Sequence, residues 1–283
     1  MKPIAIKNGL SFDVEDWFQV ENLRSAIPRE QWETLPLRVE TNTRRILALL
    51  RASESKATFF FLGWVAERCP QLVRDVDREG HEVASHGYGH ELIYRMTPES
   101  FRADVRRSKR LLEDLVGKPV LGYRAPSFSI VRDSIWAIDV LKEEGFVYDS
   151  SVFPVSLHDR YGFSERGVLP FRWPNGLLEI PLAVYKIRNF SLPVAGGGYF
   201  RLFPYCYFKF LLRRLNARQQ RFTFYLHPWE LDPGQPRVSV PPFFRFRHYI
   251  NLHRTEKGLS QLLADFAFER IAVAYNVVQQ VGA

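Results

Sequence analysis

The sequence contains little cysteine and no long apolar run, and these absences exclude several classes of protein. Its 283 residues include two cysteines, Cys69 and Cys206, neither of them in a CxxC pair, so we expect no disulfide framework and no cysteine metal site. No run approaches the roughly 18 apolar residues of a membrane-spanning helix. Residues 1–12 lack a signal-peptide pattern because Lys7 and Asn8 interrupt a short apolar run. We therefore expect a cytoplasmic protein, or one that works at the inner face of the membrane.

The chain is basic, but its charge is not concentrated in one block. Lysine and arginine number 39 against 31 acidic residues, for a formal net charge of +8, which favours an acidic partner such as an anionic polysaccharide, nucleic acid or a membrane surface. The densest cluster, within residues 102–115, interleaves basic side chains with leucines, as the solvated face of an amphipathic helix does. We expect no nucleic-acid partner.

Apolar runs alternate with amphipathic segments along the chain. The predicted strands comprise residues 4–12, 57–62, 81–85, 120–123, 145–148 and 222–226. The predicted helices comprise residues 43–51, 72–78, 98–116, 133–144, 203–215 and 259–268. Residues 150–200 are rich in proline and glycine and are expected to be irregular, with a tight backbone feature or a flexible loop at 196–198. This order predicts an α/β fold with a parallel sheet, either open or closed into a barrel.

Chemically capable side chains follow five of the predicted strands. These residues are Asp13, His86, Arg124, Asp149 and His227. In open parallel sheets and in barrels, the working residues gather at the carboxyl ends of the strands. The pattern therefore predicts one active site that draws on several distant parts of the chain.

The most specific of these segments carries two histidines, His86 and His90, separated by three residues that include two glycines. Imidazole is the commonest side-chain metal ligand near neutral pH, and this spacing allows one turn of chain to direct two rings at a single ion. One further oxygen ligand would complete a zinc-type site with an open position, as metal-assisted hydrolysis requires. The alternative is a pair of surface histidines in a polar turn.

An acidic segment at the end of the first predicted strand offers that oxygen ligand. On a strand, residues i and i+2 face the same way, so Asp13 and Glu15 would share one side, one as general base and the other as metal ligand. Asp16 is the competing ligand if the strand has already ended there. A solvated loop is the alternative for the whole segment.

The remaining candidates are Arg124, Asp149 and His227. An arginine beside a buried carboxylate fixes that group and lowers its pKa, which suits Arg124 before the rigid turn at Pro126. His227 ends a strand, where it could protonate a leaving amine, and Asp149 would pair with it and hold it protonated. Taken singly, each could instead be a surface arginine, a turn residue or a core histidine.

Taken together, these residues resemble the five motifs of the polysaccharide deacetylases (carbohydrate esterase family 4, the NodB-homology class). The matching elements are Asp13-x-Glu15, His86-x3-His90, Arg124-x-Pro126, Asp149 and Leu226-His227. Three further segments resemble a subfamily associated with exopolysaccharide (PEP-CTERM) loci, and they are Gly196–Arg201, His227–Pro233 and Arg247–Leu252. Two departures stand out, since Val14 occupies the place of a second aspartate and the tryptophan usual in the fourth motif is not obvious near Asp149.

The resemblance implies a single domain over residues 1–283, a distorted (β/α) barrel with a C-terminal extension over about 232–283 packed on it. It also implies a divalent metal, usually zinc, and roles for the individual residues. The metal ligands would be Glu15, His86 and His90; Asp13 would be the general base, Arg124 its orienting partner, His227 the general acid and Asp149 the support of that acid.

The implied reaction is hydrolysis of N-acetyl groups on the N-acetylhexosamine residues of a polysaccharide or oligosaccharide, with release of acetate. Alternatives are an amide hydrolase acting on a small or lipid-linked sugar and a non-catalytic polysaccharide-binding module. Peripheral association with membrane-bound exopolysaccharide machinery is also expected. Aromatic side chains could stack on sugar rings or belong to the core, and the candidates are Trp17, Trp173, Tyr199 and Trp229, with residues 158–160 as a further groove element.

Overall fold

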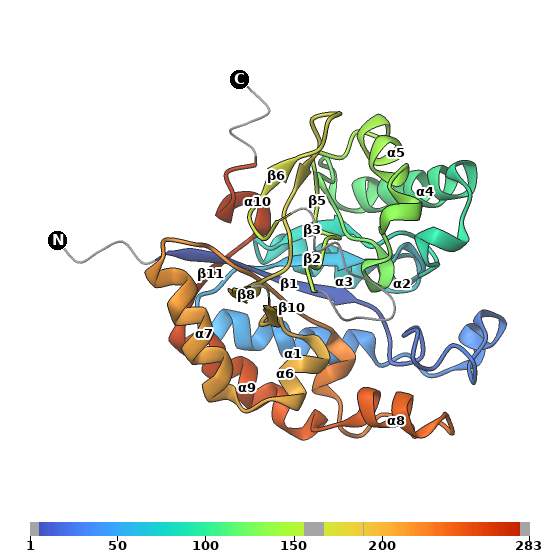
Figure 1. Ribbon diagram of the computed structural model, residues 1–283. Helices are drawn as coiled ribbons and strands as arrows, with labels where there is room; N and C mark the ends of the chain where they lie inside the picture. Colours follow the sequence, from blue (N-terminus) through green and yellow to red (C-terminus); the bar gives the residue numbers. More distant parts are fainter. Residues whose placement is uncertain (1–5, 156–166, 189, 278–283) are drawn as a thin grey trace.

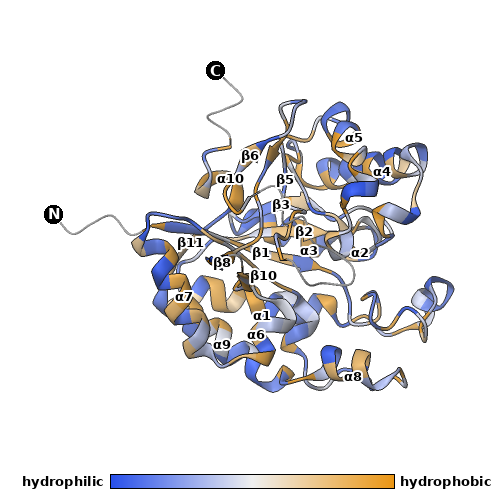
Figure 2. Ribbon diagram, in the orientation of Figure 1, coloured by the Kyte–Doolittle hydropathy of each residue, from blue (hydrophilic) through white to orange (hydrophobic). Residues whose placement is uncertain are grey.

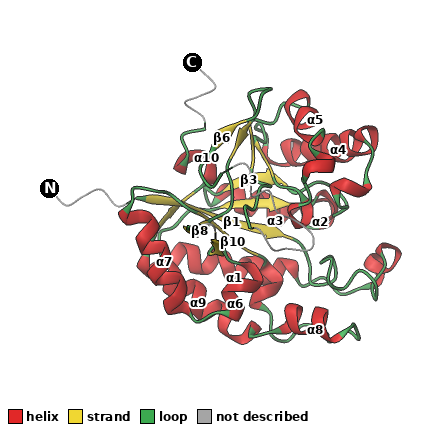
Figure 3. Cartoon of the chain, viewed as in Figure 1, coloured by secondary structure: helices red, strands yellow, loops and turns green. Residues whose placement is uncertain are grey.

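The computed structural model describes residues 6–155, 167–188 and 190–277. Within them, nine strands form one sheet in the order β10-β1-β2-β3-β4-β5-β7-β6, and β11 also pairs with β1 (Figures 1 and 3). The strands are β1 Lys7–Val14, β2 Thr58–Phe61, β3 Glu82–Ser85, β4 Gly122–Tyr123, β5 Tyr148–Asp149, β6 Phe171–Arg172, β7 Leu178–Glu179, β10 Thr223–Leu226 and β11 Ala267–Glu269. All pairs are parallel except β6 with β7.

The sheet is a curled half-barrel, and the predicted α/β class is confirmed. Strands β10 and β6 stand at the two ends of the strand order, and no ladder joins them in the described residues. The helices are α1 Val39–Ala52, α2 Gly63–Arg68, α3 Pro70–Arg78, α4 Pro98–Val116, α5 Ala137–Glu143, α6 Gly197–Leu202, α7 Tyr205–Ala217, α8 Pro242–Tyr249, α9 Leu252–Asp265 and α10 Ile271–Ala274. In the view of Figure 1, α1, α6, α7 and α9 lie below the sheet, and α4 and α5 lie at its upper right.

The centre of the sheet is apolar on both faces. Strand β2 is fully buried, and Phe59, Phe60 and Phe61 have no exposed surface. A continuous apolar strand of this kind is typical of a parallel sheet covered on two sides, and burial of each ring contributes roughly 1.5–3 kcal/mol. The colouring of Figure 2 follows this pattern, with orange along the central strands and alternating orange and blue on the surrounding helices.

The longest helix follows its local sequence signals closely. Helix α4 begins after Thr97, whose side chain accepts a hydrogen bond from the amide of Ser100, and it ends at Gly117 in the left-handed conformation. A threonine cap, a proline in the first turn and a glycine after the last turn are the standard start and stop signals of a helix. The predicted range 98–116 is confirmed.

Two predictions of local structure are wrong. The sequence predicts irregular structure over residues 150–200, but this segment contains β6, β7, the hairpin of β8 (Val184–Ile187) and β9 (Phe190–Pro193), and most of α6. The predicted helix 259–268 begins earlier, at Leu252, and ends at Asp265, after which Ala267–Glu269 pairs with β1. In both cases the strands are short and their pairing depends on the tertiary fold, which overrides the local pattern.

The C-terminal region, which the sequence suggests as an extension over 232–283, takes part in the sheet. Helix α9 contacts α6, and β11 runs parallel to β1 along Lys7–Gly9. Strand β10, which is also late in the chain, pairs in parallel with β1. The first and last parts of the chain therefore build the same edge of the sheet. In the described residues, no helix combines the length and the apolarity needed to cross a bilayer.

The backbone at Gly196 lies unusually close to β10. Gly196 has φ of 120°, and a Cβ atom there would stand 2.0 Å from the carbonyl oxygen of Tyr225. The amide of Tyr225 also donates to the carbonyl of Ala195 at 2.7 Å. Only glycine combines this φ with this approach, so the glycine run at 196–198 marks a tight backbone feature at which α6 begins.

We expect Gly196→Ala to lower the free energy of unfolding by about 3 kcal/mol, because strain in the backbone and a clash with Tyr225 act together. Gly117→Ala is the matched control, since Gly117 is also left-handed but a methyl group added there would meet no atom within 4 Å, and it should lose only about 1 kcal/mol. Urea unfolding of both variants measures the difference. Equal losses would contradict the assignment of the effect to the contact with Tyr225.

Candidate active site

The carboxyl ends of the central strands open into a cavity of about 540 Å³. Its polar lining includes Asp13 and Glu15 at the end of β1, His86 and His90 after β3, and His227 after β10. These strands are neighbours in the sheet apart from the intervening β2. Residues that are far apart in sequence therefore meet at one edge of the sheet, as parallel strand ends do in this class of fold.

The acidic segment separates its three carboxylates into different environments. After β1 the chain turns sharply, with the amide of Glu15 donating to the carbonyl of Asp13 at 3.0 Å. Asp13 and Glu15 face the cavity. Asp16 points elsewhere, because its carboxylate accepts from the amides of Arg38 at 2.7 Å and Val39 at 2.9 Å, at the start of α1. Of the two candidate ligands, Glu15 lies with the histidines, and Asp16 caps a helix.

Asp16→Ala tests this division of roles. The substitution leaves the amides of Trp17, Arg38 and Val39 without their buried acceptor, so we expect the free energy of unfolding to fall by about 2–3 kcal/mol. Bound zinc, measured by mass spectrometry after dialysis, should stay at the wild-type level. A variant that keeps its stability but loses metal would instead identify Asp16 as a ligand.

Glu15, His86 and His90 form a compact cluster whose candidate ligand atoms lie within 4.8 Å of one another. Nδ1 of His86 lies 2.8 Å from the carbonyl oxygen of Arg124, so this nitrogen carries the hydrogen and Nε2 keeps its lone pair for a ligand. Burial lowers the pKa of His86 to about 4, which keeps the ring neutral. The donor set of two imidazoles and one carboxylate suits a divalent metal.

The carboxylate of this cluster has an unused oxygen. Oε2 of Glu15 lies 2.6 Å from Nε2 of His90, yet the pair lacks hydrogen-bond geometry, and this buried oxygen has no hydrogen-bond partner among the described residues. A buried carboxylate oxygen without a partner is costly unless a ligand satisfies it. Burial raises the pKa of Glu15, but the nearby charges of His90 and His227 outweigh it and lower the pKa to about 2. Glu15 is therefore ionised, as a metal ligand must be.

Glycine and an acid from α4 shape the loop that carries the two histidines. Gly87 has φ of 73° and His90 has φ of 53°, so the chain turns tightly between the two rings. The Asp104 carboxylate accepts from the amides of Tyr88 at 2.5 Å and Gly89 at 3.3 Å. Asp104 holds the loop from behind, a contact that the sequence does not indicate because α4 is remote from the motif.

Arg124 fixes the second carboxylate of the cavity. Its guanidinium donates to Oδ1 of Asp13 at 2.7 Å and to Oγ of Ser11 at 2.8 Å, and its Nε donates to the carbonyl of Ser150 at 3.0 Å. The side chain has no exposed surface, and its guanidinium lies 4.1 Å from the centre of the Phe60 ring. One oxygen of Asp13 is thus held by the arginine, and Oδ2 remains on the side of His227, 3.9 Å from its Nε2.

His227 is paired with Glu230, whereas the sequence suggests Asp149. Nδ1 of His227 lies 2.7 Å from Oε1 of Glu230, and Nε2 faces Glu15 Oε1 at 3.5 Å. Burial lowers the pKa of His227, but the carboxylates of Glu15, Glu230 and Asp13 outweigh it and raise the pKa to about 9. The ring is therefore held as a cation next to the cavity.

The predicted contact between Asp149 and His227 is wrong. Asp149 stands at the end of β5 in register with Glu179 of β7, and its Oδ1 accepts from Oγ of Ser151 at 2.6 Å. Ser151 Oγ in turn accepts from the amide of Ala125 at 2.8 Å. Asp149 thus supports the segment that follows Arg124. Burial raises the pKa of Asp149 to about 6.

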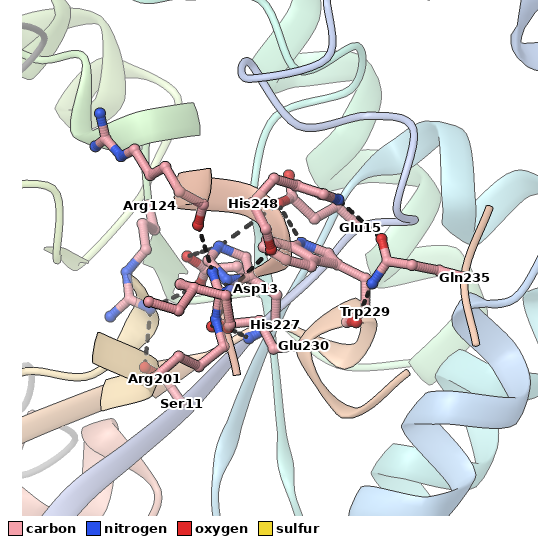
Figure 4. A network of polar contacts seen from close by, with 12 residues as sticks. Ser11, Asp13, Glu15, Arg124, Arg201, His227, Trp229, Glu230, Gln235 and His248 are labelled. Atoms are coloured by element: carbon pink, nitrogen blue, oxygen red, sulfur yellow. Dashed lines mark hydrogen bonds and ion pairs between the residues drawn. The ribbon is translucent and has the colours of Figure 1, made fainter. Parts of the chain in front are cut away.

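A second layer of side chains from the C-terminal half holds Glu230 and His227 in place (Figure 4). The Arg201 guanidinium donates to Oε2 of Glu230 at 2.6 Å and to the carbonyl of His248 at 2.8 Å. Trp229 is stacked between the rings of His227 and His248, at centroid distances of 5.2 and 4.5 Å. Its indole nitrogen donates to Oε1 of Glu15 at 3.1 Å.

Apart from Trp229, which the sequence suggests only for sugar stacking, these supporting residues do not emerge as functional positions from the sequence interpretation, although a signal exists for Glu230. An acid three residues after His227, on a short turn of helix over Pro228–Leu231, reaches back to the histidine by local geometry. Of the aromatic residues considered for sugar stacking, Trp17 and Trp173 are buried away from the cavity, whereas Tyr199 and the mostly buried Trp229 line it. Residues 158–160 lie outside the described residues.

A curled half-barrel with paired histidines, an ionised acid and a histidine–carboxylate pair at its strand ends is the arrangement of a hydrolase. More specifically, part of the chain matches the polysaccharide deacetylase family. Residues 31–147 match the family model Polysaccharide deacetylase, and residues 150–276 match the Domain of unknown function (DUF3473). Strands of both segments belong to one sheet. The acidic segment with Asp13 and Glu15 precedes both matched ranges.

Curated relatives agree with this family match. A peptidoglycan-N-acetylglucosamine deacetylase of Bacillus cereus is 33% identical over 106 residues, which is 38% of this chain and 48% of that protein. A peptidoglycan deacetylase of Helicobacter pylori is 33% identical over 115 residues, 40% of this chain and 38% of that protein. The chain thus matches about half or less of the length of these relatives.

The fold similarity extends over nearly the whole chain. A candidate polysaccharide deacetylase from Mycobacterium smegmatis superposes with a TM-score of 0.62 at 21% identity, over 99% of this chain and 93% of that one. A PuuE allantoinase superposes with a TM-score of 0.62 at 19% identity, over 98% and 91%. At these identities the likeness concerns the fold.

Proposed function

We propose that the protein is a metal-dependent N-deacetylase that hydrolyses N-acetyl groups on N-acetylhexosamine residues of a polysaccharide and releases acetate. The observation that carries the proposal is the meeting of Glu15, His86 and His90 with Asp13 and His227 around one cavity. A ligand cluster, a second carboxylate and a cationic histidine are the parts that amide hydrolysis requires. The names of the peptidoglycan deacetylases among the relatives support the choice of an N-acetylated glycan.

The residues of the chain divide the proton transfers between them. A divalent metal, for which zinc is the proposed identity, would supply Lewis-acid polarisation of the acetamide carbonyl and of water when held by Glu15, His86 and His90. Asp13 takes a proton from the attacking water through Oδ2, because Arg124 holds Oδ1. His227 gives the proton on Nε2 to the departing amine, while Glu230 holds Nδ1. The products are acetate and a free amino group on the sugar.

Acetate release tests the proposal directly. The full chain would be incubated with N-acetylglucosamine oligomers, with peptidoglycan and with a lipid-linked N-acetylhexosamine, each with and without a chelator. We expect release from at least one polymeric or oligomeric glycan, its loss with chelator and its return with added zinc. Acetate release that is unchanged by chelator would contradict a metal-dependent reaction. Release from the lipid-linked sugar alone would show that the substrate is not a polymer.

Glu230→Gln is expected to reduce kcat by about 10²-fold, because the partner of a proton-transfer histidine orients the ring and stabilises its cation. The variant should also move the alkaline limb of the kcat profile to lower pH. The sign follows from the charge, since Glu230 raises the pKa of His227 toward about 9, and an amide in its place lets the acid deprotonate at lower pH.

Asp149→Asn is the matched control for this prediction. It makes the same change from acid to amide at a buried site that does not touch His227. We expect it to leave the alkaline limb where it is, whatever its effect on stability. A shift of the limb in Asp149→Asn but not in Glu230→Gln would restore Asp149 as the partner of the acid.

A further inference from the structure

A surface patch away from the active site combines exposed apolar side chains with basic ones. Strand β8 ends at Ile187, whose register partner on β9 is Phe190, and the two residues are 48% and 72% exposed. On helix α7, which contacts β8, Phe210 is 56% exposed and lines one hollow with Ile187. The hairpin–α7 surface is defined here as Lys186, Ile187, Arg188, Phe190, Phe210, Arg214 and Arg218.

The basic side chains of this surface are not neutralised by acids of the same chain. Within the described residues, Lys186, Arg188 and Arg214 form no ion pair, and the hollow that they line contains no aspartate or glutamate. The Arg214 guanidinium lies over the Phe210 ring at 4.6 Å. Arg218 donates to the hydroxyl of Tyr185 at 2.9 Å. The positive charges of this part of the described chain therefore surround the apolar side chains without a neutralising acid.

Helix α4, which carries the densest cluster of basic residues in the sequence, behaves differently. Arg102 pairs with Glu144 at 3.0 Å, Arg106 pairs with the same carboxylate at 2.7 Å, and Arg107 pairs with Glu67 at 3.2 Å. This is the solvated and internally balanced surface that the sequence suggests. The density of positive charge along the sequence thus does not locate unbalanced charge on the surface, and the hairpin with α7 is one place in the described residues where such charge surrounds exposed apolar side chains.

We propose that the hairpin–α7 surface binds the face of an anionic lipid bilayer. Ile187, Phe190 and Phe210 enter the boundary between head groups and acyl chains, and the surrounding lysine and arginine side chains contact lipid phosphates. Apolar side chains ringed by unpaired cations are the combination by which a protein lies on an anionic membrane without crossing it. The inference is independent of the proposed activity, because none of these residues lines the active-site cavity.

Other partners fit the surface less well. A second copy of the chain would bring two sets of unpaired cations face to face, and this like-charge contact opposes association. An acidic polysaccharide would satisfy the cations and could stack on the phenylalanine rings, but it offers the aliphatic side chain of Ile187 no apolar partner. A bilayer accepts both kinds of side chain at once, because its phosphates and its acyl chains are adjacent.

Vesicle sedimentation of the full chain tests the proposal. The probes are vesicles of phosphatidylcholine alone and vesicles that also contain phosphatidylglycerol. We expect binding to the anionic vesicles only, with a decrease as salt increases. Arg188→Gln combined with Arg214→Gln should weaken that binding roughly 25-fold, since each basic residue near the surface contributes about fivefold. Phe190→Ser combined with Phe210→Ser should weaken it about tenfold or more.

The matched control is Arg102→Gln combined with Arg106→Gln on α4, which makes the same change in net charge at ion-paired positions. It should bind as the wild type does, and circular dichroism should show that all variants are folded. Equal losses in the two arginine pairs, or equal binding to neutral and anionic vesicles, would overturn the proposal. A dimer in light scattering that the phenylalanine pair dissociates would also overturn it, in favour of a second copy as the occupant.

Discussion

Asp13→Asn is expected to lower acetate release by about 10²–10⁴-fold while leaving bound zinc unchanged. The amide keeps the shape of the side chain and can still accept the hydrogen bond that Arg124 donates to Oδ1. The amide nitrogen that takes the place of Oδ2 cannot accept a proton from water. Substrate binding and metal content should therefore persist, and the loss should fall on kcat rather than on KM.

Ser11→Ala provides the control, because Ser11 accepts from the same guanidinium nitrogen but carries no acid. A loss below about tenfold is expected, as for removal of one neutral hydrogen bond. His227→Ala separates the base from the acid when the substrate carries a leaving group that needs no proton, such as an aryl acetate ester. The histidine variant should then retain much of its rate, and Asp13→Asn should not. A wild-type rate for Asp13→Asn on the glycan would remove Asp13 from the mechanism.

The part of the site that depends on local spacing could be predicted from the sequence. The two histidines, separated by Gly87, Tyr88 and Gly89, lie on one tight turn, and their rings have a centroid distance of 5.6 Å. Asp13 and Glu15 also both line the cavity, although the chain leaves strand geometry between them, with the amide of Glu15 donating to the carbonyl of Asp13. In both cases the residues are close in sequence, so that the local backbone already places them near one another.

Contacts between distant segments were harder to predict. Asp149 follows a strand as the other site residues do, but its direction depends on the pairing of β5 with β7, which brings Glu179 opposite it. Arg201, which holds Glu230, comes from α6, a helix that begins inside the segment expected to be irregular. Strands of two residues, such as β6 and β7, carry too little periodicity to be recognised in the sequence.

Glu15→Gln is expected to weaken zinc binding by at least about 100-fold, because an amide oxygen replaces the only anionic ligand of the cluster. The readout is thermal unfolding with and without zinc, since a ligand that binds the folded state at about 100 times its Kd stabilises it by about 2.7 kcal/mol. The wild type should show a rise in Tm with zinc, and Glu15→Gln should not. Acetate release should fall in parallel with metal content.

Asp16→Ala makes the comparison decisive, because the two acids are adjacent in sequence. Its Tm should be lower than that of the wild type in both conditions, since the start of α1 loses its cap, but the rise with zinc should remain. Glu15→Gln should give the opposite pattern, because the unpartnered oxygen of Glu15 belongs to the cluster and not to the packing of a helix. A zinc-induced rise that survives in Glu15→Gln and disappears in Asp16→Ala would exchange the roles of the two residues. In that case the chain would have to turn differently after β1, so that the carboxylate of Asp16 faces the two histidines.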